Sequence, residues 1–133
     1  MVKKYQTKDS GQRTKYSSGM NRDLQTDKPR FDLITPLGMP YEETLFYRWA
    51  MLMNRGAIKY GIRNWEKANG IDEFNDFKAS LWRHFFQFMS GENDEDHMSA
   101  ICFNLNGLCY LMWKLNIDIN GNKRDDKNAS GKN

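Results

Sequence analysis

The sequence predicts an all-α protein in which two helices form a hairpin and a third helix crosses it. Apolar residues recur at intervals of three and four in three separate segments, as on one face of a helix. Acidic residues or a proline begin each segment, which is typical of helix N-termini. No strand pattern in the chain is stronger than the short stretch 30–34. A length of 133 residues suits a single domain with a modest core.

The first helix is predicted to begin at Pro40, because proline suits the first turn and the acids that follow suit its positive end. Its apolar pattern continues to Met53, and Gly61 ends it. The second helix is predicted over about 72–90, with an aromatic stripe and a glycine directly after it.

The third helix is predicted from the acids at 94–96 to about Asn116. It is apolar on nearly all faces, which indicates burial on several sides. In so small a chain, we expect part of that burial to come from a second subunit. Short connections make the last two helices an antiparallel hairpin.

The two ends of the chain are polar, and we expect residues 1–18 and 120–133 to be disordered tails around a single domain at 19–119. Residues 1–30 contain eight Lys or Arg and three Asp, a net charge of +5. Because the whole chain carries +3, the remainder carries −2. A basic arm beside an acidic body suits a polyanionic ligand such as a nucleotide.

Several classes of protein are not expected. No apolar run is long enough for a membrane span, and the basic, polar start does not resemble a signal peptide. Cys102 and Cys109 lie seven residues apart on one predicted helix, where a disulfide is implausible. Free thiols favour a cytoplasmic location.

The turn between the last two helices is a candidate metal site. Glu92, Asp94, Glu95, Asp96 and His97 lie within six residues, and carboxylates with phosphate oxygens are the usual ligands of Mg²⁺. The alternative is ordinary capping, since acids stabilise helix N-termini.

His84 strengthens the functional interpretation of this turn. In an antiparallel hairpin it lies level with Asp96 and His97. Arg83 and Asn104 add polar groups to the same apolar hairpin, and such groups must be satisfied or functional.

A second candidate segment, Lys59–Glu66, is predicted to bind a nucleotide. Lys59 and Arg63 are suited to phosphate, and Tyr60 and Trp65 to stacking on a base. Asn64 offers a donor and an acceptor for a base edge. The alternative is structural, with the glycine ending a helix and the tryptophan packing over the hairpin.

A third segment holds Arg30, a further phosphate ligand. Pro29 stiffens the backbone so that Arg30 and Asp32 project from an extended stretch, and we expect Phe31 to anchor it.

Five short blocks in this order resemble a family found largely in bacteriophages, the N-terminal domains of dATP/dGTP diphosphohydrolases. The resemblance covers about residues 19–111. The blocks are Gly19–Asp23, Lys28–Leu33, Gly56–Gly61 with Arg63–Glu66, Ser80–Leu81 with Arg83–His84, and Gly91–His97 with Asn104.

The resemblance implies a fold similar to the MazG-like helical bundles, completed by oligomerisation. It also implies a nucleotide pyrophosphohydrolase that uses Mg²⁺ or Mn²⁺ to convert purine deoxynucleoside triphosphates to monophosphates and pyrophosphate. MazG-like proteins carry ExxE and ExxD pairs on two helices. Here Phe46 stands where the first pair needs its second acid, and the only ExxE, Glu92–Glu95, lies at a turn.

The ligand set is therefore expected to be rearranged. The expected metal ligands are Glu43, Glu92, Asp96 and His97, and the expected catalytic residues are His84, Glu92, Asp96 and His97. The expected substrate-binding residues are Arg30, Lys59, Tyr60, Arg63, Asn64, Trp65, Arg83 and Asn104.

Two other functions stay open. A chain with an incomplete carboxylate set could bind and sequester a nucleotide without hydrolysing it, using the same cations and tryptophan. A small nucleic-acid-binding module using the basic arm is the third hypothesis and ranks last, because the body of the chain is acidic. The expected partners are thus a purine nucleotide and further copies of the chain, with no membrane.

Overall fold

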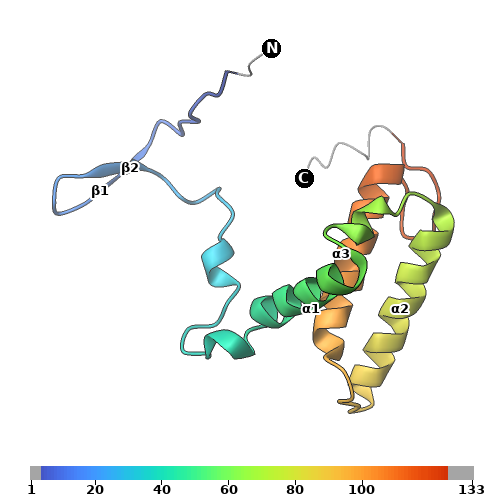
Figure 1. Ribbon diagram of the computed structural model, residues 1–133. Helices are drawn as coiled ribbons and strands as arrows, with labels where there is room; N and C mark the ends of the chain where they lie inside the picture. Colours follow the sequence, from blue (N-terminus) through green and yellow to red (C-terminus); the bar gives the residue numbers. More distant parts are fainter. Residues whose placement is uncertain (1–3, 126–133) are drawn as a thin grey trace. The chain divides into compact units, whose positions relative to one another are not determined.

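The computed structural model describes residues 4–125. The chain divides into two compact units, residues 1–34 and 35–133, each considered by itself below (Figure 1). The sequence-based boundaries at 18/19 and 119/120 stay predictions, whereas the division between the compact units lies at 34/35.

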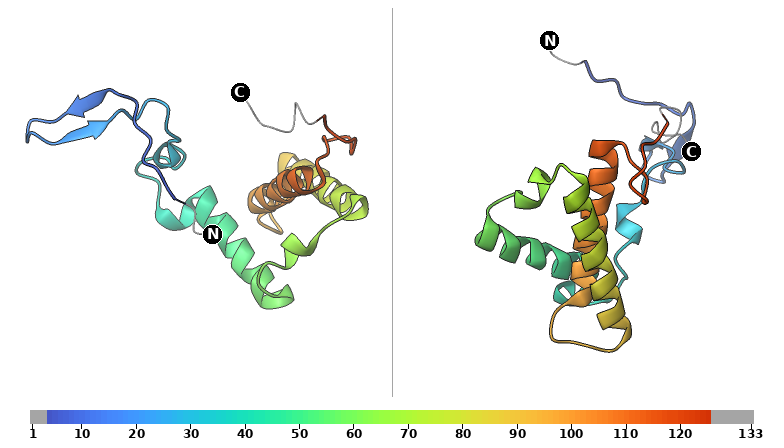
Figure 2. Two further views of the ribbon diagram at one scale, coloured as in Figure 1. Left: turned by 90° about the horizontal axis from the view of Figure 1, so that it is seen from above. Right: turned by 90° about the vertical axis from the view of Figure 1, so that its right-hand side faces the viewer.

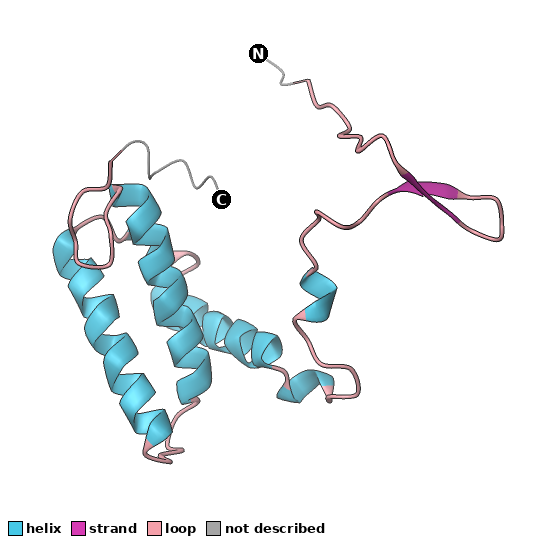
Figure 3. Cartoon of the chain, turned by 180° about the vertical axis from the view of Figure 1, so that it is seen from behind, coloured by secondary structure: helices cyan, strands magenta, loops and turns pink. Residues whose placement is uncertain are grey.

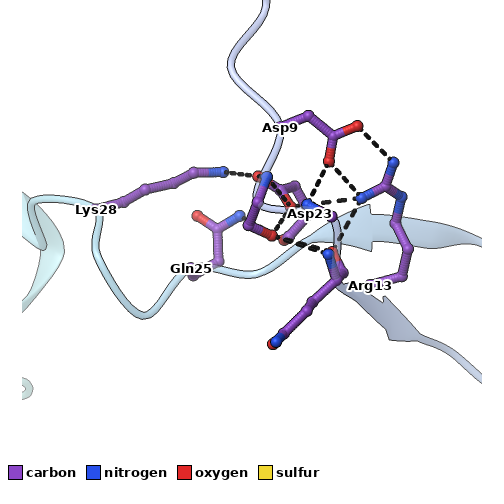
Figure 4. A network of polar contacts seen from close by, with 8 residues as sticks. Asp9, Arg13, Asp23, Gln25 and Lys28 are labelled. Carbon is purple, nitrogen blue, oxygen red and sulfur yellow. Dashed lines mark hydrogen bonds and ion pairs between the residues drawn. The ribbon is translucent and has the colours of Figure 1, made fainter.

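The first unit is a small hairpin. Strand β1 (Arg13–Lys15) pairs antiparallel with β2 (Asn21–Asp23), with Arg13 opposite Asp23. A network of ion pairs supports it (Figure 4): Arg13 holds both oxygens of Asp9 at 2.7 and 2.8 Å. The hydrogen bond from Arg13 lowers the pKa of Asp9 to about 2. Lys28 and Arg13 both lie within 4 Å of the carboxylate of Asp23, at 3.7 and 3.6 Å.

Two sequence-based expectations for this unit differ from the structure. Strand β1 lies within residues 1–18, which the sequence predicted to be disordered, although residues 1–3 lie outside the described part. The stretch around Arg30 is not extended, because Phe31–Leu33 form a 3-10 helix, η1. Arg30 donates to both oxygens of Asp32, at 2.9 and 2.7 Å, and this contact two residues along the chain favours a tight turn.

The second unit is helical, which confirms the predicted all-α class. Its elements are η2 (Tyr41–Glu43), α1 (Leu45–Tyr60), η3 (Asn64–Lys67), α2 (Ile71–Met89) and α3 (His97–Leu115). Helices α2 and α3 form the predicted antiparallel hairpin, and α1 crosses α3 (Figures 1 and 2). Completion of the fold by a second subunit stays a prediction.

Local side chains and glycines determine where these helices begin and end. Residues 41–43 form the short helix η2, so α1 begins later than predicted, at the cap Thr44, whose hydroxyl accepts from Tyr47 N at 3.2 Å. Gly61, with φ 99°, ends α1 as predicted. The first turn of α3 is capped by Asp96.

The core lies between α2 and α3. Phe74, Leu108 and Leu111 are buried there, and Ile117 closes it from beyond the end of α3. Gly107 faces the ring of Phe77 so closely that a Cβ built at this position would lie 2.5 Å from a ring carbon. The absence of a side chain at Gly107 therefore sets how closely the two helices approach.

After α3 the chain turns back on itself. Ile117 pairs with Lys123, and the N–H of Arg124 donates to the carbonyl of Asn116 at 3.0 Å. Residues 120–125, predicted to be disordered, thus belong to an ordered turn, and residues 126–133 lie outside the described part. None of the helices in residues 4–125 has the length and apolar character needed to cross a membrane.

Gly107→Ala is expected to destabilise the protein by about 1–2 kcal/mol, because overpacking against Phe77 outweighs the gain in helix propensity. Gly56→Ala is the matched control within α1, since a Cβ there meets nothing within 4 Å. It should stabilise by about 0.5–1 kcal/mol. Urea unfolding measures both, and equal effects of the two changes would contradict this account of helix contact.

Candidate functional site

A pocket of about 500 Å³ lies in the second unit. It is bounded by the second half of α1 and the following loop, by α2, and by the first turns of α3. Its lining residues are Leu52, Met53, Arg55, Gly56, Ala57, Lys59, Tyr60, Gly61, Arg63, Asn64, Trp65, Ser80, His84, Glu95, Asp96, Ala100 and Phe103. This volume is in the range that small-molecule sites occupy.

One wall of the pocket is basic. Arg55 and Lys59 lie four residues apart on α1 and so project from one side of the helix. Within residues 4–125, neither has a carboxylate within 4 Å. The backbone of Arg63 is in the left-handed region, with φ 59°, and its guanidinium forms an ion pair with Glu66. The wall therefore carries positive charge that an anionic ligand can neutralise.

The same wall carries aromatic groups. Tyr60 is exposed, and the ammonium of Lys59 lies 5.0 Å from the centre of its ring. Trp65, in η3, meets the ring of Tyr110 edge-on at 5.2 Å. The hydroxyl of Tyr110 donates to the carbonyl of Glu66 at 3.2 Å, which ties η3 to α3. Trp65 is thus held in place at the pocket edge.

A chain of titratable groups runs from His84, in the opposite wall, to His97 and Asp94, which do not line the pocket. The Nδ1 atoms of His84 and His97, both buried, lie 2.9 Å apart, and His97 Nε2 lies 2.8 Å from Asp94 Oδ1. Burial lowers the pKa of His84, with a further contribution from Arg83, so the neutral imidazole is favoured. The hydrogen bond from His97 lowers the pKa of Asp94.

This network defines the tautomers when both rings are neutral. A carboxylate accepts only, so His97 Nε2 carries the proton and its Nδ1 is the acceptor. His84 then donates from Nδ1, which leaves Nε2 of His84 unprotonated. Because His84 lines the pocket, this nitrogen is available to bind a cation or to accept a proton.

Among residues 4–125, two groups of side chains have the spacing of metal ligands. His84, Glu95 and His97 form one, and Glu92, Asp94 and His97 form the other, with the ligand atoms of each group within 4.8 Å of one another. His97 belongs to both. The structure therefore places His84 and Glu95 in one group with His97, and Glu92 and Asp94 in the other, and the binding of metal by any of them stays a prediction.

Asp96 has a different position from the one expected of a metal ligand. Its two oxygens accept from Nη2 and Nε of Arg48, at 2.7 and 2.9 Å, and also from the backbone N–H and hydroxyl of Ser99. Burial raises the pKa of Asp96, but these hydrogen bonds outweigh it and the net shift is downward. Both oxygens are thus committed to holding α1 against the start of α3.

Four other expected site residues are not brought to this cluster. Glu43 is exposed in η2 and belongs to neither ligand group. Arg83 points to Ser80, at 3.4 Å, and does not line the pocket. Asn104 is buried and donates to the carbonyl of Ala100 at 2.8 Å, a satisfied core residue. Arg30 lies in the first unit, so its part in the site stays a prediction.

Four residues in or beside the site were not among the sequence-based candidates. Asp94 and Glu95 belong to the acidic turn, but the sequence does not show which carboxylates of the turn lie beside the histidines. Arg55 stands one helical turn before Lys59, which is a signal that could have found it. Arg48 interrupts the apolar pattern of α1, but its partner is 48 residues away.

The arrangement combines two chemistries across one pocket. Cations and aromatic rings on one wall suit a nucleoside phosphate, and imidazoles with carboxylates on the other suit a divalent cation.

Comparison with known proteins gives one match. A family model described as dATP/dGTP diphosphohydrolase, N-terminal, matches residues 18–127, which include every residue of the pocket. No curated protein and no solved structure matches the chain.

Arg48 and Asp96 are expected to be coupled by about 1–2 kcal/mol, the range for charge-assisted hydrogen bonds. A double-mutant cycle measures this coupling energy, from the urea unfolding of the native chain, Arg48→Met, Asp96→Asn and the double variant. Asparagine can still cap α3, so the cycle isolates the ion pair.

The same pair predicts a pH dependence. Because the pKa of Asp96 lies below its ordinary value of 3.8, its stabilisation is complete above that pH and is lost as pH falls further. The stability difference between the native chain and Asp96→Asn should therefore shrink in acid. A difference that grows on acidification would contradict the assignment.

Proposed function

The chain belongs to the family of dATP/dGTP diphosphohydrolase N-terminal domains, as its motifs predicted, and on this premise we propose that its pocket binds a purine deoxynucleoside triphosphate and hydrolyses it to the monophosphate and pyrophosphate. The observation that carries the proposal is that a basic, aromatic wall shares one pocket with His84 and Glu95, which belong to a potential ligand group with the buried His97.

The basic wall supplies the substrate contacts. Arg55 and Lys59 bind phosphate oxygens, and Arg63 adds a guanidinium that can bind two oxygens at once. Tyr60 and Trp65 offer ring faces and edges to a purine. Asn64 offers hydrogen bonds to the edge of the base.

The opposite wall suits a divalent cation. Burial keeps His84 neutral, which is the form that binds a metal, and Glu95 supplies a carboxylate in the same group. Both nitrogens of His97 are hydrogen-bonded, to His84 and to Asp94, so His97 could join this set only by giving up one of these bonds. Imidazole and carboxylate donors together suit Mn²⁺ better than Mg²⁺, which prefers oxygen ligands. When bound, the ion would supply charge neutralisation at the phosphates and activation of water.

The chain's own groups orient this wall. Asp94 fixes the tautomer of His97, and His97 accepts from His84. The one free lone pair of His84, on Nε2, can either bind the cation or accept a proton from water in the pocket, and it cannot do both at once. Arg48 holds Asp96 and thereby the first turn of α3, on which His97 stands.

A nucleotide-binding protein that does not hydrolyse its ligand is the second candidate. It is favoured by the engagement of Asp96 with Arg48 and by the separate position of Glu43, which leave fewer carboxylates than the family resemblance implied. The phosphate-binding wall would serve it unchanged.

Hydrolysis is tested directly with the full chain, dGTP or dATP, and Mn²⁺ or Mg²⁺. The expected products are the deoxynucleoside monophosphate and pyrophosphate, separated by ion-exchange chromatography. Lys59→Ala should raise KM about tenfold, since it removes a charged phosphate contact. Lys67→Ala is the matched control, because Lys67 is exposed and does not line this pocket. Triphosphate bound tightly but recovered intact would establish the binder instead.

The cation cluster makes a separate prediction. EDTA should abolish hydrolysis, and Mn²⁺ should restore it at lower concentration than Mg²⁺. His84→Ala should lower kcat at least 100-fold, the range for loss of a general base, while nucleotide binding by calorimetry persists. Hydrolysis that survives both EDTA and this substitution would exclude the His84–Glu95–His97 group from catalysis.

A further inference from the structure

The first unit is a β-hairpin without a core of its own. Strands β1 and β2 have three residues each and form one two-stranded sheet (Figure 3). No residue from 4 to 34 is buried. A two-stranded hairpin alone is at best marginally stable in water, because it buries little apolar surface. A partner that binds one face of this hairpin would therefore stabilise it.

The register of the hairpin separates its side chains onto two faces. Arg13 lies opposite Asp23, and side chains alternate along a strand, so these two share one face. Asp9 pairs with Arg13, and Lys28 pairs with Asp23, which collects four charged groups in one cluster (Figure 4). Arg22 precedes Asp23 in β2 and therefore lies on the opposite face.

The opposite face also carries an aromatic ring. The N–H of Tyr16 donates to the carbonyl of Met20 at 2.9 Å, which continues the pairing of β1 with β2. This pairing places Tyr16 and Met20 on the same face as Arg22, and their side chains are 45 and 51% exposed. Within residues 4–125, Arg22 has no carboxylate within 4 Å. The Tyr16–Arg22 face thus presents a ring beside an unpaired guanidinium.

The unit as a whole is basic. Residues 1–34 contain eight Lys or Arg and four Asp, a net charge of +4, so the other unit carries −1 of the total of +3. Within residues 4–125, Lys4, Lys8 and Lys15 also lack a carboxylate within 4 Å. The acidic part of the chain, which counts against nucleic-acid binding by the whole, belongs to the other compact unit.

We propose that the Tyr16–Arg22 face of the hairpin binds single-stranded nucleic acid. An unpaired base stacks on the ring of Tyr16, and the guanidinium of Arg22 binds a neighbouring phosphate. The lysines without acidic partners attract the rest of the phosphate backbone. A single strand suits this face better than a duplex, because the bases of a duplex already stack on one another. This function is separate from the proposed hydrolysis, whose pocket lies in the second unit.

An anionic membrane suits the hairpin less well. A peripheral membrane site needs apolar side chains that enter the bilayer. The turn of the hairpin instead consists of Ser17, Ser18 and Gly19, closed by a hydrogen bond from the N–H of Gly19 to the carbonyl of Tyr16 at 2.9 Å. The end of the hairpin is therefore polar.

The test is fluorescence anisotropy of a labelled oligothymidylate of about 20 nucleotides, which is longer than one binding site of this kind, with the full chain in EDTA. Affinity should fall as NaCl rises from about 50 to 200 mM. Three or four phosphate contacts predict a slope of about −2 to −3 for the logarithm of affinity against that of salt. The duplex of the same length should bind at least about fivefold more weakly, because it offers no unstacked base.

Substitutions on the Tyr16–Arg22 face test its role. Arg22→Gln should make the salt slope shallower by about 0.7, the loss of one phosphate contact. Tyr16→Ala should weaken binding by about 5- to 100-fold, the range for one stacked base. Tyr16→Leu keeps apolar bulk without a ring and should weaken binding similarly, whereas Tyr16→Phe should bind as the native chain does. Lys67→Gln removes an exposed cation of the second unit and should leave the affinity unchanged.

Far-UV circular dichroism checks that each variant folds. The proposal is overturned by an absence of binding at the lowest salt, by equal effects of Lys67→Gln and Arg22→Gln, or by native affinity in Tyr16→Leu. Equal affinity for the duplex would exclude stacking on Tyr16. Displacement of the oligonucleotide by dGTP, or its loss in Lys59→Ala, would assign binding to the pocket of the second unit.

Membrane binding is measured separately with vesicles of phosphatidylcholine and phosphatidylserine. Sedimentation of the chain with these vesicles, without binding of the oligonucleotide, would overturn the proposal in favour of a membrane site. The oligonucleotide contains no purine, and EDTA removes divalent cations. The outcome is therefore independent of whether the second unit hydrolyses a triphosphate.

Discussion

The ion pair between Arg48 and Asp96 joins the parts of the chain on which the candidate site depends. Arg48 stands on α1, which carries the basic wall, and Asp96 caps α3, which begins with His97. Both oxygens of Asp96 are bonded to the guanidinium and to Ser99. Since the helix cap and the interhelical contact share one carboxylate, the orientation of α1 and the start of α3 are set together. The width of the pocket between α1 and the start of α3 is therefore set by the same carboxylate.

A second constraint is the close packing of α2 on α3. Gly107 admits the ring of Phe77, so the helices approach along their length, and this brings His84 within hydrogen-bonding distance of His97 near the turn. The buried imidazoles need partners, and Asp94 supplies one from the turn. The same hairpin therefore provides both the core and the titratable wall of the pocket. Its outer face is left apolar and exposed.

The helices and their order followed from the period of the apolar residues, and the short acidic turn predicted the hairpin that places His84 level with His97. The Lys59–Trp65 segment was recognisable because its cations and rings alternate around a helix-ending glycine. The role of Asp96 was not accessible in this way. An aspartate at a helix start can cap, bind metal or pair with a distant arginine, and only the packing of α1 decides among these. Likewise, the hairpin β1–β2 depends on ion pairs between residues up to ten apart, within a stretch that has no apolar period.

Because both oxygens of Asp96 are hydrogen-bonded to Arg48 and Ser99, the proposed catalysis depends on a smaller set of candidate side chains. With Glu43 exposed and outside both ligand groups, His84 and Glu95 are the potential donors that line the pocket with the basic wall, whereas His97, Glu92 and Asp94 do not line it. Mn²⁺ accepts nitrogen ligands, so it needs fewer carboxylates than Mg²⁺, which prefers oxygen ligands. The proposed hydrolysis would then rest on one unprotonated imidazole nitrogen, that of His84, with Glu95 in the same group, because both nitrogens of His97 are hydrogen-bonded. Such a site has fewer carboxylates near the proposed triphosphate. The electrostatic repulsion between carboxylates and phosphates, which the cations of the basic wall must offset, is therefore smaller.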